Sequence, residues 1–311
     1  MAMQILRGSD NIANPLVRAV LTMGNFDGVH RGHQAILARV VDVARSIGGT
    51  PVVYTFDPHP ATVLAPERPF FLLQTIPQRL RVLADCGIAV TVLEPFTASL
   101  AALAPKDFFD NILRARIAPT HVIVGYDFTF GLHRAGRVEL LKTLGSRHLI
   151  SVEVIEPVFD KETLISSTYI RQCLREGRIA SATAALGRPH AIEGALVRGR
   201  GIGRQIGFPT ANLLPDNALI PPDGVYITSV RLDNRTYPAA TYIGRNPTFG
   251  GETQVIETYL LDFAGTIEAE RMEIALHELL RGDVRFDSTD ALRTQIEKDV
   301  AAARKYHTNR T

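Results

Sequence analysis

The sequence predicts two domains of different class: an α/β domain with a doubly wound parallel sheet, followed by a β-rich, barrel-like domain that ends in a helix. Short apolar runs alternate with amphipathic stretches up to about residue 186, which favours parallel strands joined by helices. Beyond that point, strand-like runs follow one another with turn residues between them. The length of 311 residues suits about two domains of ordinary size.

In the first half, apolar runs predict buried strands and the stretches between them predict helices. The predicted strands are Ala19–Met23, Pro51–Phe56, Ala89–Leu93, His121–Val124 and Ser151–Ile155. The predicted helices are His33–Ile47, Pro77–Cys86, Pro105–Arg114 and Val138–Leu144. Sheets of this kind bind ligands at the carboxyl ends of their strands, near the point where the strand order reverses. Residues that directly follow the strands are therefore candidates for a site.

The pattern changes after a short Ala-rich helix, Ile179–Leu186, which ends at Gly187 as its C-cap. The strands expected beyond it are Val225–Leu232, Thr236–Ile243, Val255–Leu261 and Met272–Leu276. Asp233-Asn234-Arg235 joins the first two as a hairpin. A terminal amphipathic helix carries Leu292, Ile296 and Val300 at a spacing of four residues. We expect domains at residues 1–186 and 187–311.

Composition narrows the class of protein. Lys and Arg number 34 and Asp and Glu 32, and this near-balance argues against a nucleic-acid coat or a polybasic membrane protein. Two cysteines, Cys86 and Cys173, are too few for a disulfide scaffold, and no Cys/His cluster suggests zinc. No apolar stretch reaches the ~18–20 residues of a membrane-spanning helix. We expect a cytoplasmic protein that binds neither nucleic acid nor membrane.

Residues 24–33, Gly-Asn-Phe-Asp-Gly-Val-His-Arg-Gly-His, lie between the first strand and the first helix. His30 and His33 share one helix face, and the helix N-terminus suits a phosphate chain. Gly32 leaves room for a ligand near the backbone. Imidazole donors aimed at a charged transition state are worth about 3–4 kcal/mol each. Chance would give His-x-Gly-His only ~0.02 times in such a chain, which favours a function over two surface histidines.

Three further segments lie at strand ends in the same half: residues 55–60 (Thr-Phe-Asp-Pro-His-Pro), 125–131 (Gly-Tyr-Asp-Phe-Thr-Phe-Gly) and 166–171 (Ser-Ser-Thr-Tyr-Ile-Arg). Each alone is typical of a turn or a helix cap, but together they predict one pocket at the carboxyl edge of the sheet. The hydroxyls and Arg171 suit a triphosphate. Phe128 and Phe130 suit either a flat ring or the core. The chain has no P-loop.

The second half holds a glycine- and arginine-rich loop, residues 198–204, followed by Gly-Phe-Pro-Thr-Ala-Asn at 207–212. Its glycines let backbone N–H groups cup phosphate oxygens, and we expect no helix after it. Thr210 and Asn212 offer oxygens to a Mg²⁺ ion that also takes phosphate ligands. Glu257 sits in an apolar strand, where a carboxylate is costly unless it is paired or functional. It is a candidate general base, unless its face of the strand is open to solvent.

These segments, in this order, resemble the bifunctional riboflavin kinase/FAD synthetases of bacteria over about residues 4–306. The resemblance implies an N-terminal nucleotidyltransferase domain that joins FMN to AMP from ATP and releases pyrophosphate. It also implies a C-terminal antiparallel β-barrel of six strands that phosphorylates riboflavin to FMN with ATP and Mg²⁺. The implied partners are the small molecules riboflavin, FMN and ATP.

Roles for individual residues follow from the same resemblance. The implied catalytic residues are His30, His33 and Glu257. ATP would be held by Asn25, Asp27, Ser166, Ser167 and Arg171 in the first half, and by Gly199, Gly201 and Arg204 in the second. Flavin would be held by Asp57, Asp127, Phe128, Asn246 and Arg281. Thr210 and Asn212 would bind Mg²⁺.

The kinase half departs from the family pattern at two places. Tyr259 stands where His is usual, and Ile267-Glu268-Ala269 stands where Leu-Tyr-Gly is usual. Two alternatives therefore stay open: a transferase with a degenerate kinase domain, and a non-catalytic flavin-binding regulator. An aminoacyl-tRNA synthetase, suggested by His-x-Gly-His alone, would need a second, Lys-rich ATP motif and a basic surface, and the chain has neither.

Overall fold

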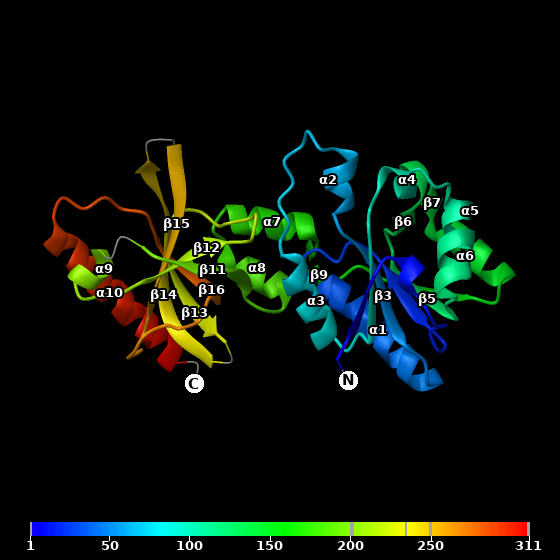
Figure 1. Ribbon diagram of the computed structural model, residues 1–311, viewed down its shortest axis with the longest axis horizontal. Helices are drawn as coiled ribbons and strands as arrows, with labels where there is room; N and C mark the ends of the chain where they lie inside the picture. Colours follow the sequence, from blue (N-terminus) through cyan, green and yellow to red (C-terminus); the bar gives the residue numbers. More distant parts are fainter. Residues whose placement is uncertain (1, 200–201, 234, 249–250, 310–311) are drawn as a thin grey trace. The chain divides into compact units, whose positions relative to one another are not determined.

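The computed structural model describes residues 2–199, 202–233, 235–248 and 251–309 (Figure 1). Internal contacts divide the chain into two compact units, Met1–Ser166 and Ser167–Thr311. The predicted domain boundary after residue 186 lies further along the chain. Two helices, α7 (Ser167–Arg175) and α8 (Ile179–Leu186), group with the second unit because α8 packs on its strands.

The first unit is built on a six-stranded sheet with the order β1-β4-β3-β2-β5-β8. Its strands are β1 (Gln4–Arg7), β2 (Val20–Met23), β3 (Pro51–Phe56), β4 (Val90–Glu94), β5 (His121–Gly125) and β8 (Ser151–Ile155). All neighbouring strands are parallel, as predicted. The chain proceeds from β2 to β3 and β4 on one side and returns to β5 on the other. The loop after β2 therefore starts where the strand order reverses, which is where such sheets bind ligands.

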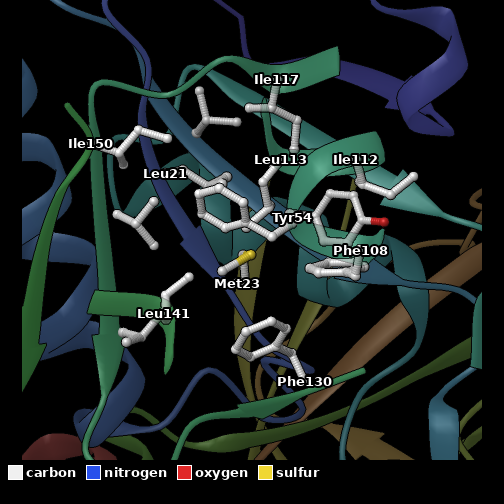
Figure 2. Packing of buried hydrophobic residues seen from close by; sticks show 14 of the residues in the cluster. Leu21, Met23, Tyr54, Phe108, Ile112, Leu113, Ile117, Phe130, Leu141 and Ile150 are labelled. Atoms are coloured by element: carbon white, nitrogen blue, oxygen red, sulfur yellow. The ribbon is translucent and has the colours of Figure 1, made fainter. Parts of the chain in front are cut away.

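Helices cover both faces of this sheet, which confirms the doubly wound arrangement. On one face, α1 (Arg31–Ile47) and α3 (Ile76–Asp85) bury Leu37 and Leu83 against Val20 and Val53. The other face is covered by α5 (Pro105–Phe108), the π-helix η2 (Phe109–Ile117) that continues it, and α6 (Val138–Arg147). Figure 2 shows side chains of this second core, with Leu113 near Leu21 and Tyr54, and Leu141 near Met23. Burial of two apolar faces is the main stabilising contribution to the unit.

Short elements connect these layers. They are η1 (Ser9–Asn11), α2 (Pro60–Leu64), α4 (Ala98–Ala101), β6 (Thr129–Phe130), η3 (Leu132–Arg134), β7 (Gly136–Arg137), β9 (Phe159–Asp160) and β10 (Thr163–Leu164). The longer helices have defined ends: α1 stops at Gly48, whose φ of 62° suits glycine.

The second unit is a closed antiparallel barrel with the strand order β11-β12-β15-β14-β13-β16. Its strands are β11 (His190–Val197), β12 (Ala211–Pro215), β13 (Gly224–Leu232), β14 (Arg235–Thr248), β15 (Gly251–Leu260) and β16 (Arg271–Gly282). The helices are α7, α8, α9 (Ile202–Gln205) and α10 (Thr289–Thr308). The six-stranded barrel, the β13–β14 hairpin and the terminal helix are confirmed. The single turn α9 includes residues 202–204 at the end of the glycine-rich loop, which the sequence did not predict, and the next element is the strand β12.

The barrel wall has two distinct faces, because successive residues of a strand point to opposite sides. Buried side chains fill the interior; among them Thr228, Thr241 and Thr258 form a hydroxyl chain with two hydrogen bonds of 2.8 Å. Residues of the outer face, such as Ile227 and Tyr259, pack instead with apolar residues of α10. This helix lies along the outside of the barrel strands (Figure 1).

Candidate functional site

The loop between β2 and α1 stacks two imidazoles at the start of a helix. His30 is the N-cap of α1, and its Nδ1 accepts a hydrogen bond from the backbone N–H of His33 at 3.4 Å. The two ring centroids lie 3.7 Å apart, with the planes 20° from parallel. Buried Phe26 packs against the His33 ring at 5.1 Å. The predicted proximity of the two histidines is confirmed, although His30 precedes the helix and does not lie within it.

Gly32 lies directly against this stacked pair. A Cβ atom at this position would lie 3.2 Å from two atoms of the His30 ring, closer than carbon atoms normally approach. The sequence predicted that the glycine leaves room for a ligand, whereas the space is taken by His30. The carbonyl of Ile165 lies 3.9 Å from the same point, which brings half-buried Ser166 near this helix start. Ser167 and Arg171 lie on α7 of the second unit, and their role with ATP stays a prediction.

Asp27 stabilises the same loop through its buried carboxylate. Its side chain is only 2% exposed, and both carboxylate oxygens accept from the backbone N–H of Leu73, at 3.0 and 3.3 Å. A hydrogen bond to a buried carboxylate contributes roughly 1.5–3 kcal/mol. Asn25 accepts a hydrogen bond at its backbone carbonyl from Thr55 Oγ1, at 3.2 Å. Both predicted residues thus hold the shape of the loop that carries the histidines.

Sequence reasoning missed Arg79, which joins this loop to the end of β3. Its Nη1 donates to the carbonyl of Asn25 at 2.7 Å, and its Nη2 donates to the carbonyl of Phe56 at 2.8 Å. Burial lowers the pKa of Arg79, and the charges of Asp27 and Asp57 oppose that shift. The signal in the sequence is the position of the arginine four residues before Leu83, on the apolar face of the helix.

The other predicted residues of the first half follow the strands β3 and β5. Asp57 is half-buried at the end of β3. Exposed Asp127 turns back over Gly125, where its Oδ1 lies 3.4 Å from the position of a Cβ atom on that glycine. Phe128 is half-buried and stacks on Phe130 with 5.7 Å between ring centroids. Phe130 itself belongs to the core (Figure 2), so of these two rings only Phe128 stays a candidate for flavin contact.

In the barrel, Glu257 lies on the outer face of β15 within a polar group. It stands opposite Asn212 of β12 and Tyr242 of β14, and partners that face each other across a ladder share one side of the wall. Thr210 Oγ1 donates to Glu257 Oε2 at 3.4 Å. The residues on either side of Glu257, Ile256 and Thr258, are buried in the interior instead. The predicted base and the predicted metal ligands therefore lie together on the outside of the barrel.

The glycine-rich loop packs directly on these residues. A Cβ on Gly199 would lie 2.3 Å from Asn212 Nδ2, and one on Gly203 would lie 3.2 Å from Thr210 Oγ1. Backbone of the loop thus reaches the predicted Mg²⁺ ligands at a distance that only glycine allows. Arg204 is exposed on α9. Gly201 lies outside the described residues, and so does the side chain of Asn246 on β14.

Arg281, a predicted flavin ligand, is engaged elsewhere in the described structure. Its guanidinium forms a fork with buried Asp299 of α10, with Nη2 at 2.8 Å from Oδ2 and Nε at 3.1 Å from the same oxygen. This ion pair ties the terminal helix to β16. A flavin contact by Arg281 stays a prediction, and the observed contact gives the residue a structural role.

Sequence reasoning also missed Tyr242, which shares the outer face with Glu257. Burial raises the pKa of Tyr242 to about 12, and the carboxylates of Asp283, Asp223 and Glu257 add to the shift. A Cβ atom on Gly244 would lie 2.1 Å from the hydroxyl oxygen of Tyr242, so the absence of a side chain at position 244 leaves room for the tyrosine. The phenol therefore stays protonated and is a hydrogen-bond donor beside the predicted base.

Comparisons with known proteins match both halves. The family model of FAD synthetase matches residues 13–169, and that of riboflavin kinase matches residues 186–307. The bifunctional riboflavin kinase/FMN adenylyltransferase of Pseudomonas fluorescens is 37% identical over 309 residues, which cover 97% of each chain. Its counterpart in Escherichia coli K12 is 35% identical over 98% of each chain.

The fold is shared with a solved structure described as the macrolide-efflux protein of Streptococcus pneumoniae. That chain is 31% identical, with a TM-score of 0.89 and coverage of 98% of this chain and 99% of the other. Among the residues that the structure describes, none of the helices is long and apolar enough to cross a membrane. Relatives at this identity over nearly the full length show the family. The chain therefore belongs to the bifunctional riboflavin kinase/FMN adenylyltransferase family.

Proposed function

We propose that this chain converts riboflavin to FAD in two steps, each of which uses ATP. The barrel unit phosphorylates riboflavin to FMN, and the first unit adenylylates FMN and releases pyrophosphate. The observation that carries the proposal is that each unit gathers its own polar group: stacked His30 and His33 at the start of α1, and Glu257 with Thr210 on the barrel wall. Membership of the family over both halves supports the same two activities.

Adenylyl transfer needs alignment and charge neutralisation, and no general base. The FMN phosphate is already an anion, so its oxygen attacks the α-phosphorus of ATP while the bond to pyrophosphate breaks. His30 and His33 would donate hydrogen bonds to the phosphate oxygens as charge develops there. The positive end of the α1 helix dipole adds to the stabilisation of that charge. The stacking of the two rings fixes both donors before substrate arrives.

Riboflavin phosphorylation begins from a neutral hydroxyl, which makes a base useful. Glu257 would accept the proton of the ribityl 5′-hydroxyl as its oxygen bonds to the γ-phosphorus and ADP leaves. The hydrogen bond from Thr210 holds one oxygen of this carboxylate in place. Tyr259, which stands where the family usually has His, packs with α10 and Phe208, with 5.4 Å between the two ring centroids.

The residues around Glu257 fit a Mg²⁺ ion that arrives with ATP. Thr210 and Asn212 provide hard oxygen donors, which Mg²⁺ prefers, and the ion ordinarily keeps phosphate and water ligands besides. Within the described ranges, there is no group of three or more His, Cys, Asp or Glu residues that could hold a metal ion by themselves. When bound, the ion would neutralise charge on the transferred phosphate.

The remaining assignments are proposals of the same kind. Asp57, Asp127 and Phe128 would contact the flavin or the adenine in the transferase. The transferase domain would extend to residue 186, where the match to the riboflavin kinase family model begins. We place the enzyme in the cytoplasm, where the thiols of its two cysteines, Cys86 and Cys173, would stay reduced.

A product assay with two variants tests the proposal. Purified protein is mixed with riboflavin, ATP and Mg²⁺, and riboflavin, FMN and FAD are separated over time. We expect Glu257→Gln to abolish FMN formation and to leave FMN-to-FAD conversion intact. His33→Ala should lower FAD formation about 100-fold and leave the kinase intact. Loss of both activities in either folded variant would refute two separate sites. FAD from FMN alone would mean a degenerate kinase, and flavin binding without turnover a regulator.

A further inference from the structure

Arg79 is a buried cation that links the two loops carrying predicted transferase residues. One of its hydrogen bonds goes to the carbonyl of Asn25, in the loop that leads to His30. The other goes to the carbonyl of Phe56, the last residue of β3 and the neighbour of Asp57. Because β2 and β3 are adjacent parallel strands, both loops leave the same edge of the sheet. One side chain therefore fixes the spacing of the two loops.

The guanidinium is held firmly from its own helix as well. A capping box starts α3: Thr75 Oγ1 accepts from the N–H of Gln78, and Gln78 Oε1 accepts from the N–H of Thr75. The backbone N–H of Arg79 donates to the carbonyl of Thr75 at 3.0 Å. Leu83, one turn further on, is fully buried. The backbone of Arg79 is thus held in place against the sheet. Its side chain in turn holds the two loops through its hydrogen bonds.

The charge of Arg79 is deeply buried. Arg79 is 2% exposed, and within the part of the chain that the structure describes its Nε has no hydrogen-bond partner. The nearby carboxylates of Asp27 and Asp57 act on Arg79 through their charge and oppose the effect of burial on its pKa. A buried and incompletely paired cation is destabilising relative to an apolar side chain of similar length. Stability of the fold is therefore a poor explanation for its presence.

We infer that Arg79 is a positioning residue for adenylyl transfer, which sets the His30–His33 loop at a fixed distance from the Asp57 loop. The inference rests on the proposed adenylylation of FMN. Groups bound to the two loops must meet in line for the reaction, and a misplacement of about 1 Å lowers such rates about 100-fold. Loss of the guanidinium should thus slow the chemical step more than it weakens the binding of ATP or FMN.

Two variants at this position and one matched control test the inference. Arg79→Met removes the charge and both hydrogen bonds, whereas Arg79→Lys keeps the charge and can reach one carbonyl. Arg81→Met removes an exposed arginine from the same helix. We expect kcat for FMN-to-FAD conversion to fall at least tenfold in Arg79→Met, with KM for either substrate changed less than threefold. Arg79→Lys should lie between, and Arg81→Met should match the wild type.

Riboflavin kinase activity of the same molecules is the internal reference, and circular dichroism gives the folded fraction. A kcat per folded molecule in Arg79→Met within twofold of Arg81→Met would overturn the inference. If Arg79→Met does not fold, Arg79→Lys decides, and a wild-type kcat in that variant would overturn it equally. Failure of the wild type to make FAD from FMN would instead refute the proposed function, and is seen before any variant is compared.

Discussion

Acid should destabilise the barrel through His190. This residue starts β11, is 3% exposed, and its Nε2 has no hydrogen-bond partner among the described residues. Burial lowers the pKa of His190 to about 4 from the ordinary 6.5, with a smaller contribution from the charge of Arg188. The folded barrel therefore keeps the ring neutral at a pH where the unfolded chain has already bound a proton.

The sign and size of the effect follow from that difference. Well above pH 6.5, His190 is neutral in both the folded and the unfolded state, and the full stability is present. As the pH is lowered from 6.5 to about 4, only the unfolded state binds a proton at this residue, so the free energy of unfolding decreases. Each pKa unit is worth about 1.4 kcal/mol, so the loss is about 1.4 kcal/mol at pH 5.5 and about 3 kcal/mol at pH 4. Below pH 4 this residue adds no further loss.

Urea denaturation followed by circular dichroism at several pH values measures the effect. The transition of the barrel is identified by its shift when riboflavin is added, because a ligand of the folded state stabilises only the unit that binds it. We expect His190→Leu to remove about 3 kcal/mol of the pH dependence, and the exposed-site control His133→Leu to keep it. Parallel stability curves for wild type and His190→Leu would refute the reasoning.

Two further predictions concern glycines that make room for predicted site residues. Gly32→Ala places a Cβ 3.2 Å from the His30 ring, so the ring must shift by a few tenths of an ångström; we expect the rate of FAD formation from FMN to fall about tenfold, and unchanged kinetics would contradict it. Gly199→Ala places a Cβ 2.3 Å from Asn212 Nδ2, and displacing that amide should raise the KM for Mg²⁺–ATP in the kinase reaction about tenfold, as an overpacking cost of about 1–3 kcal/mol allows. In each case the other activity of the same molecule is the control, and a parallel loss of both would point to misfolding.

Hydrophobic periodicity predicted most of the fold because the strands of the parallel sheet are buried on both faces. It missed β1, whose four residues lie at the sheet edge and are mostly half-buried or exposed. It also missed β11 and β12, where Glu193, Gly194 and Asn212 interrupt the apolar pattern. These strands are fixed by ladder pairing with distant segments, and local sequence carries little information about such pairing.

The candidate site residues also divide into those that a local motif reveals and those that depend on contacts between distant segments. Motifs located His30, His33, Thr210 and Glu257, because spacing within one segment is enough to recognise them. Arg79 reaches its partner Asn25 across 54 positions of the chain, so its role depends on how α3 packs on the sheet. Spacing alone also left open which face of β15 carries Glu257, and barrel closure decides it.

The two faces of the barrel wall bear on how such an enzyme can be changed. Threonine hydroxyls and apolar side chains fill the interior, while Glu257, Asn212 and Tyr242 stand outside it. Substitutions at outward positions can therefore alter which alcohol is phosphorylated while every residue that closes the barrel is retained. A library restricted to the polar outward positions beside Glu257, such as Asn212 and Tyr242, would explore new substrates while the outward residues that pack on α10, such as Ala240 and Tyr259, are kept.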